Sequence, residues 1–203
     1  MAVNHKTQLE VENGFRQFDL TLEVVRHYLE PDRPFALRVP LILDLQKAAV
    51  EGIEADAGKL RNTPVGIHKS EHDPPPPHLV EGHLSEFCEF INSNWHERTA
   101  FYLSAYAMWR LNWIHPFSDG NGRTSRALSY SLLSLKLGYV LPGSPTIPQQ
   151  IEEDNGHYIK ALELADIAAR QGAEDIREME NMIRAMLAKQ LLTVIDAAGQ
   201  ISD

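Results

Sequence analysis

Residues 100–114 read Ala-Phe-Tyr-Leu-Ser-Ala-Tyr-Ala-Met-Trp-Arg-Leu-Asn-Trp-Ile, a stretch whose single charged side chain is Arg110. Apolar residues occur all around this stretch when it is drawn as a helix, rather than along one stripe. A helix that is hydrophobic on every side is buried in the core of a protein. We therefore expect residues 100–114 to form the central, nearly buried helix of the fold.

Further helices are predicted on both sides of this stretch. Between Phe15 and Leu29 the apolar residues recur every three or four positions, and Pro31 and Pro34 end the pattern. Similar periodicity between Gly and Pro breaks extends to the C-terminal part of the chain. The sequence therefore predicts an all-α fold. The helices other than the central one are expected at residues 15–29, 38–50, 78–93, 123–137, 149–170 and 173–197.

The helical pattern is interrupted between Ala57 and Leu79, where glycine and proline are frequent. Loops of this length inside a compact domain are often functional. The run Pro74 to Pro77 could be a ligand for a proline-recognising domain, but we favour a stiff spacer that leads into the next helix.

Composition limits the class of protein. A chain of 203 residues with 43% hydrophobic content can bury one sizeable core, so we expect one compact domain. The single cysteine, Cys88, is expected in that core and cannot form an internal disulfide, which favours a reducing, cytoplasmic location. A net charge of −9 and a pI of about 5.4 argue against nucleic acid as a partner. We expect no membrane span and see no secretory signal in the sequence.

The central helix leads directly into the loop His115-Pro-Phe-Ser-Asp-Gly-Asn-Gly-Arg123. Pro116 stops the helix and leaves His115 at its end. Gly120, Asn121 and Gly122 can turn their backbone N–H groups into one concavity at the start of the next helix. Such a concavity binds anions, because unpaired amides and the helix dipole both favour negative charge there.

Charged and titratable side chains surround this expected anion site. Arg123 and Arg126 are three residues apart on the next helix, so both emerge beside the amides and suit a polyphosphate. Asp119 is a hard oxygen ligand for a divalent cation that bridges phosphate oxygens. His115 can take a proton near neutral pH, as the activation of a hydroxyl requires. Together they predict a phosphate-transfer site.

The same nonapeptide resembles the signature of the Fic (filamentation-induced-by-cAMP) family, written His-Pro-Phe-x-Asp/Glu-Gly-Asn-Gly/Lys-Arg. Every defined position matches, and Arg126 matches the common extension. The resemblance extends from about Leu37 to Asp166, including Gly58-Lys-Leu-Arg61. It implies a Fic-type helical bundle divided into an N-terminal helical segment at 1–34, a core domain at 35–170 and a C-terminal helix at 171–203.

The resemblance also implies a protein adenylyltransferase that moves AMP from ATP to a Ser, Thr or Tyr hydroxyl. His115 would be the catalytic base and Asp119 the Mg²⁺ ligand. Around the phosphates, the family pattern implies Gly120, Asn121, Gly122, Arg123 and Arg126. A short β-hairpin flap at Thr63 to Pro76 would pair with an extended strand of a target protein. A homodimer is a further expectation that the resemblance leaves open.

Two other segments resemble family elements with departures. Tyr158 and Asp166 match in position a segment on the nucleobase side of the nucleotide, where the family usually has Tyr-Tyr and Asn, so Ile159 and Asp166 depart from the pattern. Many members carry an inhibitory helix with Ser/Thr-x-x-x-Glu-Gly/Asn. Here Gln8 stands where Ser or Thr is usual and Glu12 where the inhibitory glutamate is. We hypothesise that Glu12 restrains activity by pairing with Arg126, the alternative being a solvated glutamate.

Three other functions are compatible with parts of this sequence. A Fic-type transferase of phosphate or of another nucleotide is one, although Gly122, in place of the lysine of the kinase-like branch, favours AMP. A non-catalytic nucleotide sensor is another, but binding alone would not need His115. A metal hydrolase using His68 and His72 is disfavoured because no helical His-x-x-x-His face with a glutamate accompanies them.

Overall fold

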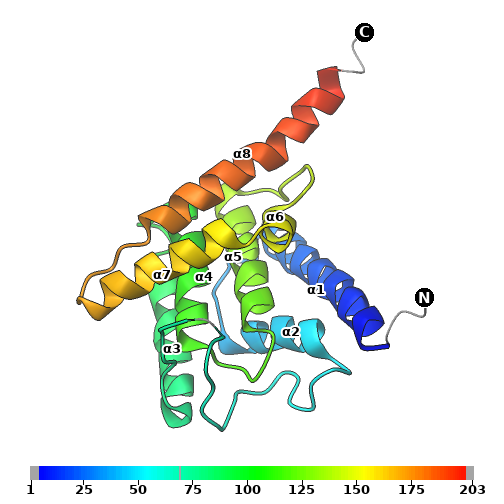
Figure 1. Ribbon diagram of the computed structural model, residues 1–203. Coiled ribbons are helices and arrows are strands. Elements are labelled where there is room, and N and C mark those ends of the chain that lie inside the picture. Colours follow the sequence, from blue (N-terminus) through cyan, green and yellow to red (C-terminus); the bar gives the residue numbers. More distant parts are fainter. Residues whose placement is uncertain (1–4, 69, 200–203) are drawn as a thin grey trace.

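The structure is a computed structural model that describes residues 5–68 and 70–199, with side chains up to residue 195. In this part of the chain there are eight helices and no strand, which confirms the all-α prediction (Figure 1). The helices are α1 (His5–Leu29), α2 (Val39–Val50), α3 (Pro77–Ser93), α4 (Ala100–Ile114), α5 (Asn121–Leu137), α6 (Ile147–Glu153), α7 (Gly156–Arg170) and α8 (Arg177–Gly199).

Two helices, α4 and α5, lie side by side at the centre of the fold and make its most extensive interhelical contact (Figure 1). Helix α4 has the bounds that the sequence predicts and is buried along most of its length. Helix α5 is buried as well, although serine recurs along it. Ser104 Oγ donates to Ser129 O at 2.9 Å, and Ser129 Oγ donates to Ser104 O at 2.9 Å. These small, mutually bonded residues join the two central helices directly.

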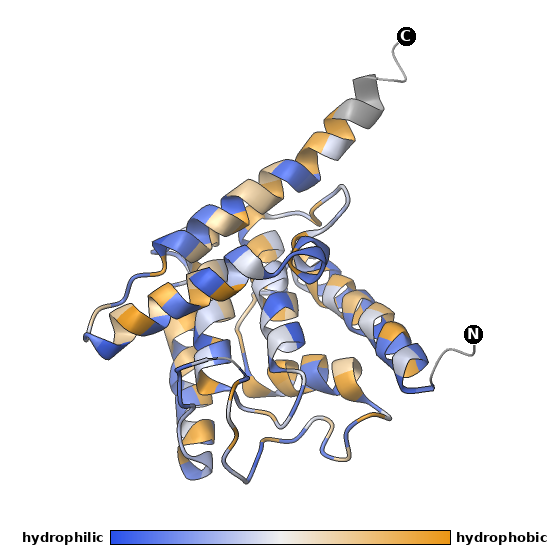
Figure 2. Ribbon diagram, viewed as in Figure 1, coloured by the Kyte–Doolittle hydropathy of each residue, from blue (hydrophilic) through white to orange (hydrophobic). Residues whose placement is uncertain are grey.

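Helix α1 packs on α2 and α5 through a largely polar stripe, which shares Val25 with the predicted apolar one. Phe15, expected on the buried face, is 69% exposed. The buried residues are Asn13, Gln17, Thr21 and Val25. Asn13 donates to Glu51 O and Gln17 donates to Leu45 O, each at 2.9 Å, so polar groups are satisfied at the contact. Figure 2 shows hydrophobic and hydrophilic residues interleaved along α1, so hydropathy alone does not define its buried face.

The expected single helix at 149–170 is wrong, because two helices, α6 and α7, occupy this region. The chain is extended at Asp154, with φ −144° and ψ 105°, and the Asp154 carboxylate accepts the N–H of Gly156 at 3.0 Å. An Asp side chain that bonds the backbone two residues later competes with the helical ladder. The Asp-Asn-Gly triplet therefore ends one helix and starts the next.

The expected β-hairpin at Thr63 to Pro76 is also not found, since the described residues of this segment form turns and bends without a strand. Proline has no N–H to donate to a strand ladder, and the segment contains Pro64 and ends in a run of prolines. We call residues 63–76 the flap segment. Its backbone is held by the side chain of Arg61, which donates to the carbonyl groups of Thr63 and Pro75.

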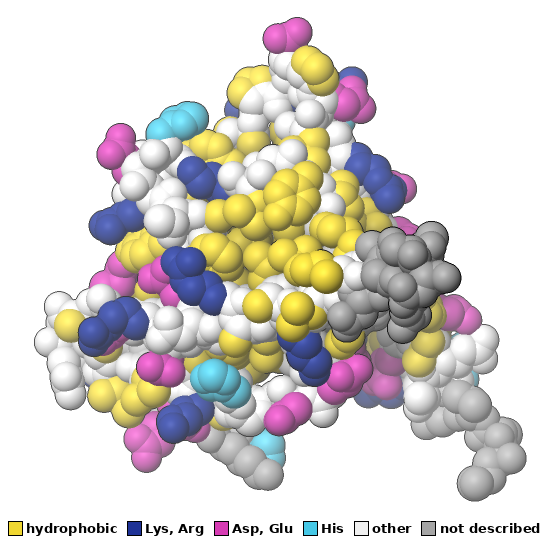
Figure 3. Space-filling model, turned by 90° about the horizontal axis from the view of Figure 1, so that it is seen from above, with side chains coloured by type: hydrophobic (Ala, Val, Ile, Leu, Met, Phe, Trp, Pro, Cys, Tyr) yellow, Lys and Arg dark blue, Asp and Glu magenta, His cyan; other side chains and the backbone are white. Residues whose placement is uncertain are grey.

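The surface carries both charged and hydrophobic areas. Seen from above, hydrophobic side chains form a broad group in the middle of the face, with charged side chains around it (Figure 3). Helix α8 projects from the body of the molecule and exposes Leu192 and Ile195. Within the described part of the chain, no helix is long and apolar enough to cross a membrane.

Candidate active site

His115 lies where α4 ends, in a left-handed conformation with φ 49° and ψ 59°. Its N–H donates to Leu111 O at 3.0 Å, so it closes the last turn of the helix. Pro116 follows and has no N–H with which to continue the ladder. The α4 helix thus delivers His115 to the loop and holds its backbone in one place.

The loop from Pro116 to Gly120 is fixed by the side chain of Asn121. Asn121 Nδ2 donates to Phe117 O at 2.8 Å, and Phe117 N donates to Asn121 Oδ1 at 3.0 Å. Phe117 and Asn121 are both buried. The Asn121 side chain therefore shapes the loop, while its backbone N–H belongs to the first turn of α5.

Gly120 starts α5 in the left-handed region, with φ 84°. A Cβ atom at this position would lie 2.8 Å from Val50 Cγ1, so both the conformation and the space require glycine. The first hydrogen bond of the helical ladder runs from Thr124 N to Gly120 O at 2.9 Å. The N–H groups of Asn121, Gly122 and Arg123 precede this ladder and form the N-terminal end of the helix dipole.

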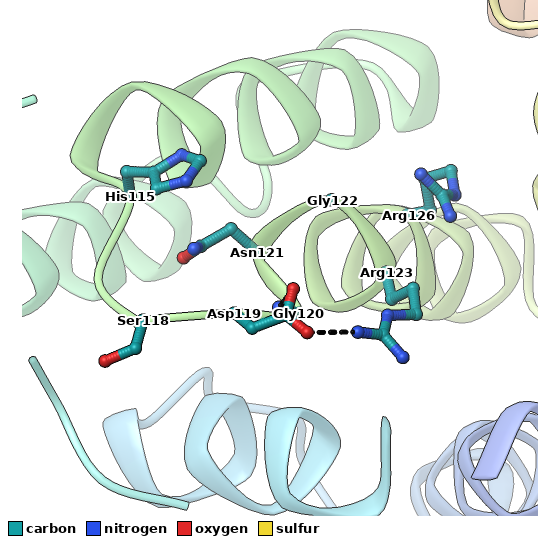
Figure 4. A pocket seen from close by; sticks show the side chains of 8 residues that line it. All are labelled: His115, Ser118, Asp119, Gly120, Asn121, Gly122, Arg123 and Arg126. Carbon is teal, nitrogen blue, oxygen red and sulfur yellow. Dashed lines mark hydrogen bonds and ion pairs between the residues drawn. The ribbon is translucent and has the colours of Figure 1, made fainter. Parts of the chain in front are cut away.

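These elements line one pocket of about 320 Å³ (Figure 4). The residues that line it share the motif loop and the first turns of α5. They are His115, Ser118, Asp119, Gly120, Asn121, Gly122, Arg123 and Arg126. All seven residues that the sequence assigns to the base, the anion site and the metal ligand are therefore together, and Ser118, at the unspecified position of the motif, joins them.

The two arginines of the pocket differ in their contacts. Arg123 Nη1 donates to Ala49 O at 2.8 Å and Arg123 Nη2 donates to Asp119 Oδ2 at 3.0 Å, the ion pair drawn in Figure 4. Arg126 Nη1 lies 3.2 Å from the position that a Cβ of Gly122 would take. Arg126 is thus beside Gly122, whereas Arg123 is anchored to α2 and to Asp119.

Asp119 is the one carboxylate that lines the pocket. Its Oδ1 accepts the N–H of Gly120 at 2.6 Å, and about half of its side-chain surface is exposed. Mg²⁺ is commonly held by one or two carboxylates together with waters and substrate phosphates. A single exposed Asp beside an anion site fits that mode of binding. In the described residues there is no cluster of three or more His, Cys, Asp or Glu that could hold a metal by itself.

The imidazole of His115 is oriented by Asn112. The two groups meet at 3.2 Å, between His115 Nδ1 and Asn112 O, so we assign the proton to Nδ1 and leave Nε2 as the acceptor. Burial, the main cause, together with the nearby Arg61 and His72 lowers the pKa of His115 to about 4, and this value already includes the opposing effects of Asn112 O and Asp119. The ring is therefore neutral at pH 7 and able to accept a proton.

The other sequence-predicted residues do not line this pocket. Tyr158 is buried and its hydroxyl accepts from Asn112 Nδ2 at 2.8 Å. Asp166 Oδ1 accepts from Trp109 Nε1 at 2.8 Å, and burial raises the pKa of Asp166. Glu12 is exposed and accepts from Gln8 Nε2 at 2.8 Å. The ion pairs of the described residues do not include one between Glu12 and Arg126.

Three residues that support the site were not assigned a role from sequence. Asn112 bonds Ser125 Oγ and Tyr158 through Nδ2 and meets His115 through its carbonyl. Gln46 donates to Asp119 O at 3.0 Å and accepts from Gly58 N at 2.6 Å. Arg61 contacts the carbonyl of His115. Asn112 could have been noticed as an amide in a largely apolar helix, and Arg61 ends the segment Gly58-Lys-Leu-Arg61 that resembles the family. Gln46 acts across the fold and leaves no local signal.

Residues 36–133 match the model of the Fic/DOC family. The chain is 29% identical over 170 residues to the protein adenylyltransferase Fic of Drosophila melanogaster, and 30% identical over 171 residues to that of Drosophila grimshawi. Each match covers 82% of this chain but 32% and 33% of the relative, so the chain spans about a third of the length of these proteins.

The fold is also found among solved structures. A Fic domain containing signaling protein from Bacteroides thetaiotaomicron matches with a TM-score of 0.79 at 20% identity, over 98% of this chain and 76% of that one. The family match, the shared helical fold and the intact motif at 115–123 together assign residues 36–133 of this chain to the Fic/DOC family.

Proposed function

We propose that this protein is an ATP-dependent nucleotidyltransferase that adenylylates a Ser, Thr or Tyr hydroxyl of a target protein. The observation that carries the proposal is the placement of a neutral base, His115, on the same pocket as the N-terminal amides of α5 and the two arginines. Its relatives in Drosophila are named protein adenylyltransferases, which supports the same reaction.

The nucleotide would bind by its phosphates at the start of α5. The amides of Asn121 and Gly122 and the helix dipole favour negative charge there. Arg126, beside Gly122, is available to a phosphate group. Arg123 is held between Ala49 O and Asp119, so we propose that it orients Asp119 as well as neutralising phosphate charge.

Asp119 is the residue that would hold Mg²⁺ together with phosphate oxygens, and the ion would supply charge neutralisation on the leaving group. The chain itself supplies the proton acceptor. His115 Nε2 takes the proton of the target hydroxyl while the hydroxyl oxygen bonds to the α-phosphorus of ATP. The bond from that phosphorus to the bridging oxygen breaks, and pyrophosphate leaves. Positioning of the two reactants is the main contribution of such a site.

The target would dock on the flap segment, residues 63–76, which runs beside the exit of α4. Backbone groups of this segment offer hydrogen bonds to an extended peptide. Tyr158 and Asp166, which lie outside the phosphate pocket, are proposed for the nucleobase side. We further propose a cytoplasmic location, supported by the single cysteine; burial raises the pKa of Cys88 to about 11, so its thiol is unreactive.

Glu12 is proposed to restrain this activity. It lies on α1, which packs against α5, the helix that carries Arg126. In the structure Glu12 bonds Gln8 instead of Arg126, so inhibition would require the carboxylate to leave Gln8 and reach the guanidinium. A carboxylate there would compete with the phosphate for Arg126 and misplace the triphosphate.

Intact-mass measurement after incubation with ATP and Mg²⁺ tests the transfer and the restraint together. The samples are the unaltered chain, Glu12→Gly, and Glu12→Gly combined with His115→Ala. Glu10→Gly, an exposed substitution two residues away on the same helix, is the matched control. We expect Glu12→Gly to gain one AMP and the other three to gain much less. A gain of one phosphate would mean kinase chemistry instead, and equal modification of Glu10→Gly and Glu12→Gly would refute the restraint.

A further inference from the structure

Arg61 is a buried charged residue that contacts several backbone carbonyl groups. It is 4% exposed. Its backbone N–H donates to Pro116 O at 2.9 Å, its Nε donates to His115 O at 2.7 Å, and its Nη2 lies 3.4 Å from Ile114 O. One residue thus contacts three successive carbonyl groups at the point where the chain leaves α4.

The same guanidinium contacts both ends of the flap segment. Arg61 Nη1 donates to Thr63 O at 3.2 Å, and Arg61 Nη2 donates to Pro75 O at 2.6 Å. Thr63 and Pro75 are far apart along the chain but are brought to one side chain. The flap segment is therefore closed at its base by the group that also binds His115.

We propose that Arg61 is a positioning residue for the transfer reaction, which joins the base of the flap segment to the backbone of His115 so that a docked target and the proton acceptor keep one relative placement. The proposal rests on the function proposed above. It assigns Arg61 no contact with substrate, since Arg61 does not line the phosphate pocket.

The conformation of His115 explains why such support is needed. His115 is a non-glycine residue at φ 49°, a region that side chains other than glycine adopt at a cost. Carbonyl contacts from Arg61 on His115 and on both of its neighbours hold the backbone in that conformation. The positive charge also lies at the carbonyl end of α4, where the helix dipole favours a cation.

Arginine is required at this position by geometry. The planar guanidinium places donors on three nitrogen atoms in a fixed fork, and here those atoms reach His115, Thr63 and Pro75. A lysine would keep the charge but has its donors on a single atom. Arg61→Lys is therefore a variant that retains the electrostatics and loses the bridge.

The experiment compares the unaltered chain, Arg61→Lys and Arg61→Ala. Arg177→Lys, at an exposed arginine, is the control. Amide hydrogen exchange is followed in peptides that cover residues 62–76, 113–118 and 121–137. ATP–Mg²⁺ affinity is measured by titration calorimetry, and transfer rates are measured by mass. Arg61→Ala is also assayed with added guanidinium ion, with methylammonium as the control cation.

We expect Arg61→Lys to accelerate exchange at both 62–76 and 113–118 by about tenfold or more while 121–137 stays protected. ATP affinity should stay within about twofold, and kcat should fall by about 10²-fold, as expected when reacting groups are misplaced by about 1 Å. Guanidinium, but not methylammonium, should restore slow exchange and part of the transfer rate of Arg61→Ala.

Two results would overturn the proposal. Faster exchange confined to 62–76 with an unchanged kcat would mean that Arg61 only closes the flap segment. Loss of protection at 121–137 together with loss of ATP affinity, without guanidinium rescue, would mean that Arg61 only stabilises the fold. If the unaltered chain binds ATP–Mg²⁺ but transfers no AMP, the proposed function fails instead, and the exchange measurements with their guanidinium rescue still decide whether Arg61 joins the two segments.

Discussion

Replacing Gly120 by alanine tests the geometric basis of the anion site. Gly120 has φ 84°, and an added Cβ would lie 2.8 Å from Val50 Cγ1, a contact that real Cβ atoms essentially never make. Val50 is fully buried in α2, so it has no open space to move into. Gly120→Ala must therefore strain the start of α5, displace the end of α2, or both.

The expected loss of stability has two parts. A non-glycine residue in the left-handed region costs about 1–2 kcal/mol. Forcing an extra methyl group into a packed core costs about 1–3 kcal/mol. We therefore expect Gly120→Ala to lower the free energy of unfolding by about 2–5 kcal/mol. Because the amides of α5 start at this residue, ATP affinity should fall as well.

Replacing Gly138 separates the conformational cost from the packing cost, because its φ is 85° but an added Cβ would meet no atom within 4 Å. Gly138→Ala should therefore lose only the conformational part, about 1–2 kcal/mol, and leave ATP affinity unchanged. Urea unfolding followed by circular dichroism measures both variants. Val50→Ala in the Gly120→Ala background should recover part of the packing loss. Equal destabilisation by Gly120→Ala and Gly138→Ala would refute the predicted clash with Val50.

Four further predictions concern the titration of His115, a buried polar group and the proposed metal ligand. The value of kcat/KM should stay level as pH falls through the usual histidine range and decline only towards pH 4, because the pKa of His115 is lowered to about 4 and the basic form persists above that pH. A pH–rate profile measures this. Because the pKa of His115 is lower in the folded chain, the folded chain binds fewer protons than the unfolded chain between about pH 6.5 and 4. The stability due to His115 is therefore lost as pH falls through that window, and His115→Ala should reduce this loss in acid unfolding. Gln190→Leu should lower the free energy of unfolding in urea by roughly 2–4 kcal/mol, because buried Gln190 bonds Tyr130 Oη and Pro142 O, each at 3.0 Å, and both would lose a partner; a change below 1 kcal/mol would contradict this. Asp119→Asn should raise the Mg²⁺ concentration needed for ATP binding in calorimetry while changing stability by less than about 1 kcal/mol, since its exposed ion pair contributes little; unaltered Mg²⁺ dependence would remove Asp119 as the ligand.

The features that sequence predicted well are those set by neighbouring residues. Helix α4 ends at Ile114 because Pro116 cannot continue it, and Gly120 opens the next helix two residues earlier than the periodicity indicated. The pocket residues follow from this local chain path, because one loop and one helical turn carry nearly all of them.

The features that sequence missed depend on contacts between distant segments. The buried stripe of α1 is polar because Asn13 and Gln17 meet carbonyl groups near the end of α2, and an apolar pattern cannot reveal such partners. The described residues of the flap segment form no strand, and carbonyl groups near its two ends instead bond one side chain, Arg61, a contact that the local sequence does not show. Tyr158 is directed to Asn112 by the packing of α7 near α4, which its position in the chain does not show.

The paired serines between α4 and α5 have a consequence for how far this site could diverge in evolution. His115, the proposed proton acceptor, caps the end of helix α4, and helix α5 begins with the amides proposed to bind phosphate. Ser104 and Ser129 meet between the two helices with their hydroxyl oxygens 2.7 Å apart. A bulkier residue at either serine would push the helices apart and increase the distance between base and phosphate without altering any residue of the motif. Conversely, substitutions at this contact could adapt the site to a leaving group of another size. The reach of the proposed base is thus determined in part by the volume of two side chains that lie outside the pocket.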